Sequence, residues 1–187
     1  MKYLRYFISV FLLSILALQA FFFLQILAGR WVNPSITAFQ LAERHRLCGW
    51  SIPYIHSCGI KQEWIEFKKI SPYLKRAITI SEDSDFYRHA GFEPQAMKDA
   101  WDRNQKNSKH LRGGSTITQQ LAKNLFLSGE KNYVRKVQEL AITAMLEIAL
   151  PKNRIFEIYL NSVEWGEGVF GIAAASQHYF AIKPNQL

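Results

Sequence analysis

The hydropathy pattern begins with an uncharged run from Tyr6 to Gly29 in which Phe, Leu and Ile dominate. As a helix, this run would be roughly 35 Å long, enough to cross a bilayer core of about 30 Å. Lys2 and Arg5 precede it, and this bias favours a cytoplasmic N-terminus with the rest of the chain outside. A cleaved signal peptide is the alternative, because Ala-Leu-Gln-Ala at 17–20 resembles a cleavage site. The apolar run continues to Gly29, however, which favours an uncleaved anchor.

Beyond this run, apolar residues recur at helical spacing between capping residues, prolines and glycines. We therefore expect a transmembrane anchor over 1–30, a membrane-proximal segment over 31–60 and a mostly α-helical domain over 61–187. The predicted helices are a short one ending near 45, then 73–80, 93–101, 116 to a turn at 128–130, 132–150, 154–161 and 171–179. A strand is suggested only around 52–56, and the polar, basic run 102–112 is expected to be a mobile loop.

The helix that starts at 116 carries a polar stripe, formed by Thr116, Gln120, Lys123 and Asn124, opposite an apolar side. Thr116 and Gln119 have the spacing of a capping box. The stripe begins at a helix N-terminus, which favours anions, and glycines just before it would let a ligand approach the backbone. A solvated helix face behind a glycine hinge is an equally good interpretation, and this helix alone does not decide between them.

The helix over 132–150 is apolar on most sides, which predicts a central position in the fold. Its polar stripe consists of Arg135, Glu139, Thr143 and Glu147. For Glu147 we expect a structural ion pair. For Glu139 we expect a place in a cleft, because a basic cluster precedes it, formed by Lys131, Arg135 and Lys136.

The net charge of +8 and the pI near 9.5 imply an anionic partner, which could be nucleic acid, anionic lipid or a phosphorylated substrate. Cys48 and Cys58 are the only cysteines. They could pair outside the cytoplasm or remain free thiols, and both alternatives stay open. Two cysteines without clustered histidines do not predict a metal site.

The most reactive stretch is Ile80-Ser-Glu-Asp-Ser-Asp-Phe-Tyr-Arg-His-Ala-Gly91, which follows an apolar lead-in. It places Glu82 and Asp83 beside aromatic residues and a histidine. Carboxylates against an apolar wall are suited to acid–base work, because burial raises the pKa of a carboxyl group toward working pH.

Together these stretches resemble the peptidoglycan glycosyltransferase family, the transglycosylase domain of penicillin-binding proteins. The match covers roughly 60–187 and consists, in order, of Glu82-Asp83-x-x-Phe86-x-x-His89-x-Gly91, Gly114 through Gln120 with Lys123-Asn124, Arg135-Lys136-x-x-Glu139, 154–161, and 171–180. Trp31 to Pro34 and Thr37 to Phe39 look like the monofunctional, membrane-anchored members. The resemblance implies a mostly α, lysozyme-like helical glycosyltransferase domain behind one transmembrane helix, and a domain that continues past Leu187.

The resemblance also implies a reaction and a location. The growing glycan on undecaprenyl pyrophosphate would be transferred to the GlcNAc 4-hydroxyl of lipid II, with inversion to a β-1,4 bond. The enzyme would sit in the inner (cytoplasmic) membrane as a single-pass protein with a periplasmic or extracellular catalytic domain. Expected partners are lipid II, the lipid-linked glycan, membrane lipid and other proteins of cell-wall synthesis or division, and no nucleic acid.

Roles for individual residues follow from this resemblance. Glu82 is expected to be the catalytic base, and Glu139 a second acid that orients the acceptor, a cation or the basic cluster. Asp83 and His89 are expected to hold the shape of the motif, with Phe86 at the cleft wall. The remaining substrate-binding candidates are Gly114, Ser115, Thr116, Gln120, Lys123, Asn124, Lys131, Arg135 and Lys136, of which the cations would stabilise pyrophosphate. No cofactor is required and no metal ligands are identified, although Mg²⁺ or Mn²⁺ could bridge pyrophosphate and acid.

Three alternative functions are compared with this one. A lytic transglycosylase or lysozyme-like hydrolase also places a glutamate beside a sugar. The basic stripe argues against it, since a hydrolase has no phosphate leaving group to stabilise. A non-enzymatic, membrane-anchored scaffold of the cell wall would need no catalytic acid. A nucleic-acid binder has only the net charge in its favour.

Overall fold

The computed structural model describes residues 2–49, 60–95, 98, 102, 105, 114–130 and 132–187. Its longer helices are α1 (Lys2–Ala28), α2 (Ala38–Cys48), α3 (Pro72–Glu82), α5 (Ile117–Phe126), α6 (Tyr133–Ala149), α7 (Lys152–Ser162) and α8 (Ile172–Phe180), with a short 3₁₀ turn η1 (Phe67–Lys69). The prediction of a mostly α-helical chain is therefore confirmed.

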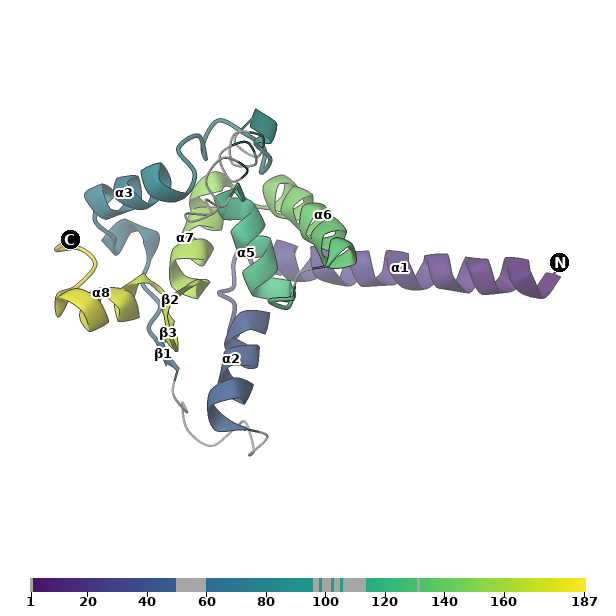
Figure 1. Cartoon of the computed structure of the whole chain (residues 1–187), viewed down its shortest axis with the longest axis horizontal. Helices are drawn as coiled ribbons and strands as arrows, with labels where there is room; N and C mark the ends of the chain where they lie inside the picture. Colours follow the sequence, from purple (N-terminus) through teal and green to yellow (C-terminus); the bar gives the residue numbers. More distant parts are fainter. Residues whose placement is uncertain are drawn as a thin grey trace.

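Helix α1 projects from the helical body as a long rod and carries the N-terminus far from the other elements (Figure 1). It is long and apolar enough to cross a membrane, by length and composition, and lies near the N-terminus. Its C-terminal half packs on α6 and α5, where the amides of Gln19 and Gln138 exchange two hydrogen bonds of 2.9 and 3.1 Å. Phe22 meets the edge of Phe126 beside them.

Arg154, near the start of α7, joins the end of α1 to the domain. Its guanidinium donates to the carbonyl oxygens of Gly29 and Val32 and to the side chain of Asn33, at 2.8 to 3.1 Å. A fourth hydrogen bond goes to Glu157, one helical turn away on α7. One planar cation therefore holds the end of α1 against α7.

The helix ends form where local chemistry predicts them. The Ser71 hydroxyl accepts from the backbone N–H of Tyr73 at the start of α3, where proline occupies the first turn. Thr116 and Gln119 form the predicted capping box at the start of α5. Asn132 caps α6 by accepting from the Arg135 N–H.

The core lies where α5, α6 and α7 pack together at the centre of Figure 1. Most of its fully enclosed side chains come from these helices and from the acidic motif, and include Phe86, Ile117, Leu121, Ile142, Leu146, Ile155, Phe156 and Leu160. On α6, Ile142 and Leu146 are enclosed, while Val137 and Ile148 face outward despite being apolar. The central position predicted for this helix is therefore confirmed for one side of it.

A small sheet corrects the prediction that strands are confined to 52–56, a segment that lies outside the described residues. The three-stranded sheet has the order β1-β3-β2, with β1 at Lys61–Gln62, β2 at Glu164–Gly166 and β3 at Val169–Phe170. Strand β1 pairs parallel to β3, with Lys61 opposite Val169, and β2 pairs antiparallel to β3. Strands of two or three residues are too short to show a period in the sequence.

The predicted mobile loop over 102–112 is wrong at two positions, because Asp102 and Gln105 are helical. The rest of that run lies outside the described residues, as does most of the helix predicted over 93–101. Cys58 lies outside them too, so the pairing of the two cysteines stays a prediction.

Candidate active site

Glu82 is the last residue of α3, and its side chain is exposed to solvent. Its Oε2 accepts a 3.0 Å hydrogen bond from Nε2 of Gln120, on the first turns of α5. The Gln120 Oε1 in turn accepts from the hydroxyl of Tyr159 on α7, at 3.1 Å. The acid is therefore held by an amide, and the amide is held by a phenol from a third helix.

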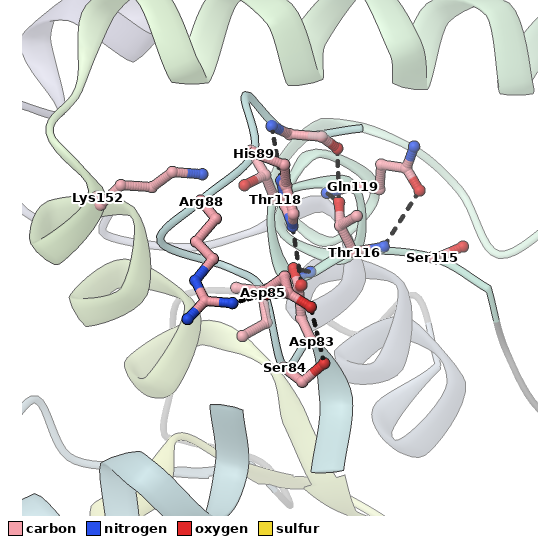
Figure 2. A network of polar contacts seen from close by, with 12 residues as sticks. Asp83, Ser84, Asp85, Arg88, His89, Ser115, Thr116, Thr118, Gln119 and Lys152 are labelled. Carbon is pink, nitrogen blue, oxygen red and sulfur yellow. Dashed lines mark hydrogen bonds and ion pairs between the residues drawn. The ribbon is translucent and has the colours of Figure 1, made fainter. Parts of the chain in front are cut away.

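Asp83, the next residue, is buried and ties the acidic motif to the start of α5. Its Oδ1 pairs with Nε2 of His89 at 2.8 Å, and its Oδ2 accepts from the backbone N–H of Ile117 at 3.0 Å. The Nδ1 of His89 accepts from the Gly91 N–H at 3.0 Å, so Nε2 carries the hydrogen that Asp83 accepts. Figure 2 shows Asp83, His89 and Thr116 gathered in this network.

Gly91 completes the attachment of the motif. Its carbonyl accepts from the Thr116 hydroxyl at 2.7 Å, and its φ of +84° is a backbone conformation that favours glycine. A Cβ built at Gly91 would lie 2.7 Å from Cγ2 of Thr143 and 2.9 Å from Cγ of Glu147. The chain therefore passes against α6 at a distance that only glycine permits.

Asp83, His89 and Glu93 bring their possible ligand atoms within 4.8 Å of one another. They nevertheless do not fit a divalent cation. Both oxygens of Asp83 and both ring nitrogens of His89 already take part in hydrogen bonds. A metal ion here would have to break the contacts that hold the motif on α5.

The basic cluster lies at the start of α6. Arg135 Nη1 donates to Glu139 Oε2 at 2.6 Å, and Lys136 Nζ contacts the other oxygen, Oε1. Glu139 is buried, while Lys136 keeps a third of its side chain exposed. On α5, the Lys123 ammonium lies 5.3 Å from the centre of the Phe39 ring. The predicted candidate Lys131 lies outside the described residues.

Glu147 forms the structural pair that the sequence predicts. Its Oε1 accepts from the Thr118 hydroxyl at 2.5 Å and pairs with Lys152 Nζ at 2.8 Å. Phe86 is fully buried against Phe156, with the Lys152 ammonium 4.4 Å from its ring centre. Phe86 therefore supports the motif from within the core.

The polar stripe of α5 is only partly open. Gln120 and Lys123 are half-buried, whereas Thr116 and Asn124 are buried, and Oδ1 of Asn124 has no hydrogen-bond partner among the described residues. Gly114 and Ser115, just before the helix, are half-buried. The stripe thus combines residues that hold the site with residues that a substrate could reach.

Sequence reasoning missed Tyr159 and Thr118. Burial raises the pKa of the Tyr159 phenol, and the charges of Glu82 and Asp83 raise it further, so the hydroxyl remains a donor. The only signal for Tyr159 was its place in the motif over 154–161. Thr118 lies off the polar stripe, and nothing local indicates that it meets Glu147.

Comparison with known proteins places this geometry in a family. The family model described as transglycosylase matches residues 53–187. A biosynthetic peptidoglycan transglycosylase of Cupriavidus metallidurans is 56% identical over 187 residues, which are 100% of this chain and 79% of the relative. Proteins of the same name from Cupriavidus pinatubonensis and Ralstonia nicotianae are each 54% identical over 100% of this chain, which covers 73% and 79% of them.

Proposed function

The chain belongs to the transglycosylase family and is a peptidoglycan glycosyltransferase, and we propose that it polymerises lipid II. In the proposed reaction, the 4-hydroxyl oxygen of the acceptor GlcNAc attacks the anomeric carbon of the lipid-linked glycan. The bond from that carbon to pyrophosphate breaks, and the α-linked donor becomes a β-1,4 bond. The hydroxyl proton goes to a base, and the leaving undecaprenyl pyrophosphate keeps the electron pair.

Glu82 is the proposed base, and the contact that carries this proposal is the 3.0 Å hydrogen bond from Gln120 to one of its oxygens. The bond aims an exposed carboxylate while leaving Oε1 without a hydrogen-bond partner among the described residues. A general base must lie within hydrogen-bond reach of the proton that it removes, and an exposed, oriented oxygen meets this requirement.

The basic cluster is proposed to receive the pyrophosphate. Arg135 and Lys136 are held side by side by Glu139, and Lys123 stands on the neighbouring helix. The buried Nε–H of Arg135 has no partner among the described residues, so it is a spare donor. Because two cations occupy the oxygens of Glu139, we assign Glu139 to orienting the cations rather than to proton transfer.

The packing of the anchor supports a site at the outer surface of the membrane. Gln138 pairs with Gln19, which lies nine residues inside the end of α1, and the neighbouring apolar residues of α6 are strongly exposed, namely Tyr133, Val134 and Val137. If α1 spans the bilayer, this part of α6 meets lipid and the basic cluster lies at the headgroups. A polyprenyl-linked substrate would reach it without leaving the membrane.

The test is turnover of labelled lipid II by the full-length enzyme, wild type against Glu82→Gln. Removal of the base should lower the rate by about 10²–10⁴. Glu63→Gln, at another exposed glutamate, is the matched control and should keep the wild-type rate. A Glu82→Gln enzyme as fast as wild type would refute the assignment of the base.

A parallel incubation with finished glycan separates synthesis from cleavage. Longer chains made from lipid II support the polymerase. Shortened glycan without polymer would instead establish a lytic enzyme. A wild-type protein that shows neither activity, together with an intact wall in Glu82→Gln cells, would favour the scaffold.

A further inference from the structure

Gln120 is held by the protein itself at both ends of its amide. Its Nε2 donates to Glu82 Oε2 at 3.0 Å and to the backbone oxygen of Ser115 at 3.3 Å. Its Oε1 accepts from the Tyr159 hydroxyl at 3.1 Å. An amide offers two donor hydrogens and one acceptor oxygen, and each has a partner here. Gln120 therefore links three helices, and only the second lone pair of its oxygen is left for a substrate.

Tyr159 is the most constrained partner of this amide. It is 3% exposed, and its ring packs beside Phe156 and meets the edge of Trp165. A ring wedged in this way can place its hydroxyl in few positions, because core side chains sit in fixed rotamers. The hydroxyl donates to Oε1 of Gln120, whereas Glu82 accepts from Nε2, so the amide connects α7 with α3.

We propose that Tyr159 is a positioning residue for the reaction: it fixes the side chain of Gln120, and Gln120 in turn aims the carboxylate of Glu82. This proposal rests on the assignment of Glu82 as the base. Without the phenol, Oε1 of Gln120 loses its donor and the amide is held only by Ser115 and by the exposed acid. The acid then samples directions in which its oxygen does not face the acceptor hydroxyl.

This role predicts a specific kinetic pattern. Misalignment of a reacting group slows the chemical step and leaves substrate contacts intact, so kcat should fall while KM stays unchanged. Because Tyr159 acts only through Gln120, its removal should have no further effect once Gln120 is gone. A purely structural role would instead add its cost to that of any other substitution.

The experiment is a double-mutant cycle in the full-length enzyme with lipid II as substrate. Tyr159→Phe and Gln120→Met each keep the volume of the side chain and remove its hydrogen bonds. We expect kcat to fall roughly tenfold in each variant and no further in the double variant. Tyr179→Phe is the matched control, since it removes a hydroxyl that bonds to the Trp165 carbonyl rather than to Gln120.

Three results would overturn the proposal: a wild-type kcat in Tyr159→Phe, a raised KM with unchanged kcat, or multiplicative losses in the double variant. The fraction of folded enzyme, measured by thermal unfolding, corrects each kcat for any variant that folds poorly. Gln120→Met reaches the same contact from its exposed side, so it keeps the proposal falsifiable if Tyr159→Phe is unstable.

A readout without substrate separates this inference from the proposed function. Solvent exchange of the Gln120 side-chain amide hydrogens, followed by NMR, should be faster in Tyr159→Phe and unchanged in Tyr179→Phe. An unchanged exchange rate in Tyr159→Phe overturns the positioning role whatever the enzyme polymerises. A wild-type enzyme that exchanges as expected but makes no glycan would refute the proposed function and leave the contact established.

Discussion

Replacing Gly91 by alanine tests whether the acidic motif depends on close contact with α6. The substitution places a Cβ on a residue with φ +84°, 2.7 Å from Cγ2 of Thr143 and 2.9 Å from Cγ of Glu147. The left-handed backbone costs roughly 1–2 kcal/mol for a residue with a side chain. Crowding in a packed interior adds about 1–3 kcal/mol. The free energy of unfolding should therefore fall by about 2–5 kcal/mol, a large part of the 5–15 kcal/mol typical of folded proteins.

Gly49→Ala separates the two contributions. Gly49 has φ +65°, but a Cβ built there meets no atom of the described residues within 4 Å, so only the backbone cost applies. The difference between the two variants is then the crowding, about 1–3 kcal/mol, which corresponds to roughly 2–12 °C in Tm for a chain of this length. The measurement is thermal unfolding of the full-length protein in detergent, followed by circular dichroism.

A second substitution checks the origin of the crowding. Thr143→Ser removes Cγ2 but keeps the hydroxyl that donates to the Glu139 carbonyl at 2.7 Å. In the Gly91→Ala background it should restore part of the lost Tm, although alone it lowers Tm because a buried methyl is removed. Equal losses for Gly91→Ala and Gly49→Ala, or no recovery with Thr143→Ser, would refute the argument from close packing.

Three further predictions concern other contacts. Asp83→Ala leaves the buried N–H of Ile117 and the ring N–H of His89 without an acceptor. The free energy of unfolding in urea should therefore fall by about 2–4 kcal/mol, and a fall below about 1 kcal/mol would contradict the network. Gln19→Leu and Gln138→Leu should each destabilise the junction of α1 and α6. The double variant should lose less stability than the sum of the two single losses, by a coupling energy of about 0.5–1.5 kcal/mol, and additive losses would mean that the two amides do not interact. Burial raises the pKa of Tyr159, so the folded chain retains a proton that the unfolded chain releases. Stability should therefore fall as the pH rises above about 10. A plot of Tm against pH should be less steep for Tyr159→Phe in this range, and equal slopes would contradict the argument.

The fold was predictable where local chemistry decides it. Ser71 with its following proline, the capping box at Thr116 and the cap at Asn132 each mark a helix start within a few residues of sequence. The sheet was not predictable in this way. Lys61 pairs with Val169, more than a hundred residues later, and two residues of strand carry no period.

In the candidate site, contacts within one helix could likewise be predicted from the sequence, whereas contacts between helices could not. The spacing of Arg135 and Glu139 on one helix predicts their ion pair, because residues four apart face each other. The contact of Glu82, Gln120 and Tyr159 depends on the packing of three helices. Helical periodicity does not decide whether Gln120 points to solvent or to a neighbouring acid. Burial of polar residues outside the polar stripe, such as Thr118, likewise follows only from the neighbouring helix.

The paired amides of Gln19 and Gln138 have a consequence for kinetics. Because they fasten α6 to α1, the catalytic domain could not swing freely above the bilayer if α1 spans it as proposed. The enzyme and the proposed lipid-linked substrate would then meet by lateral diffusion in the plane of the membrane. Turnover should follow the mole fraction of substrate among the surrounding phospholipids, so that adding inert lipid slows the enzyme even when the bulk amount of substrate is unchanged.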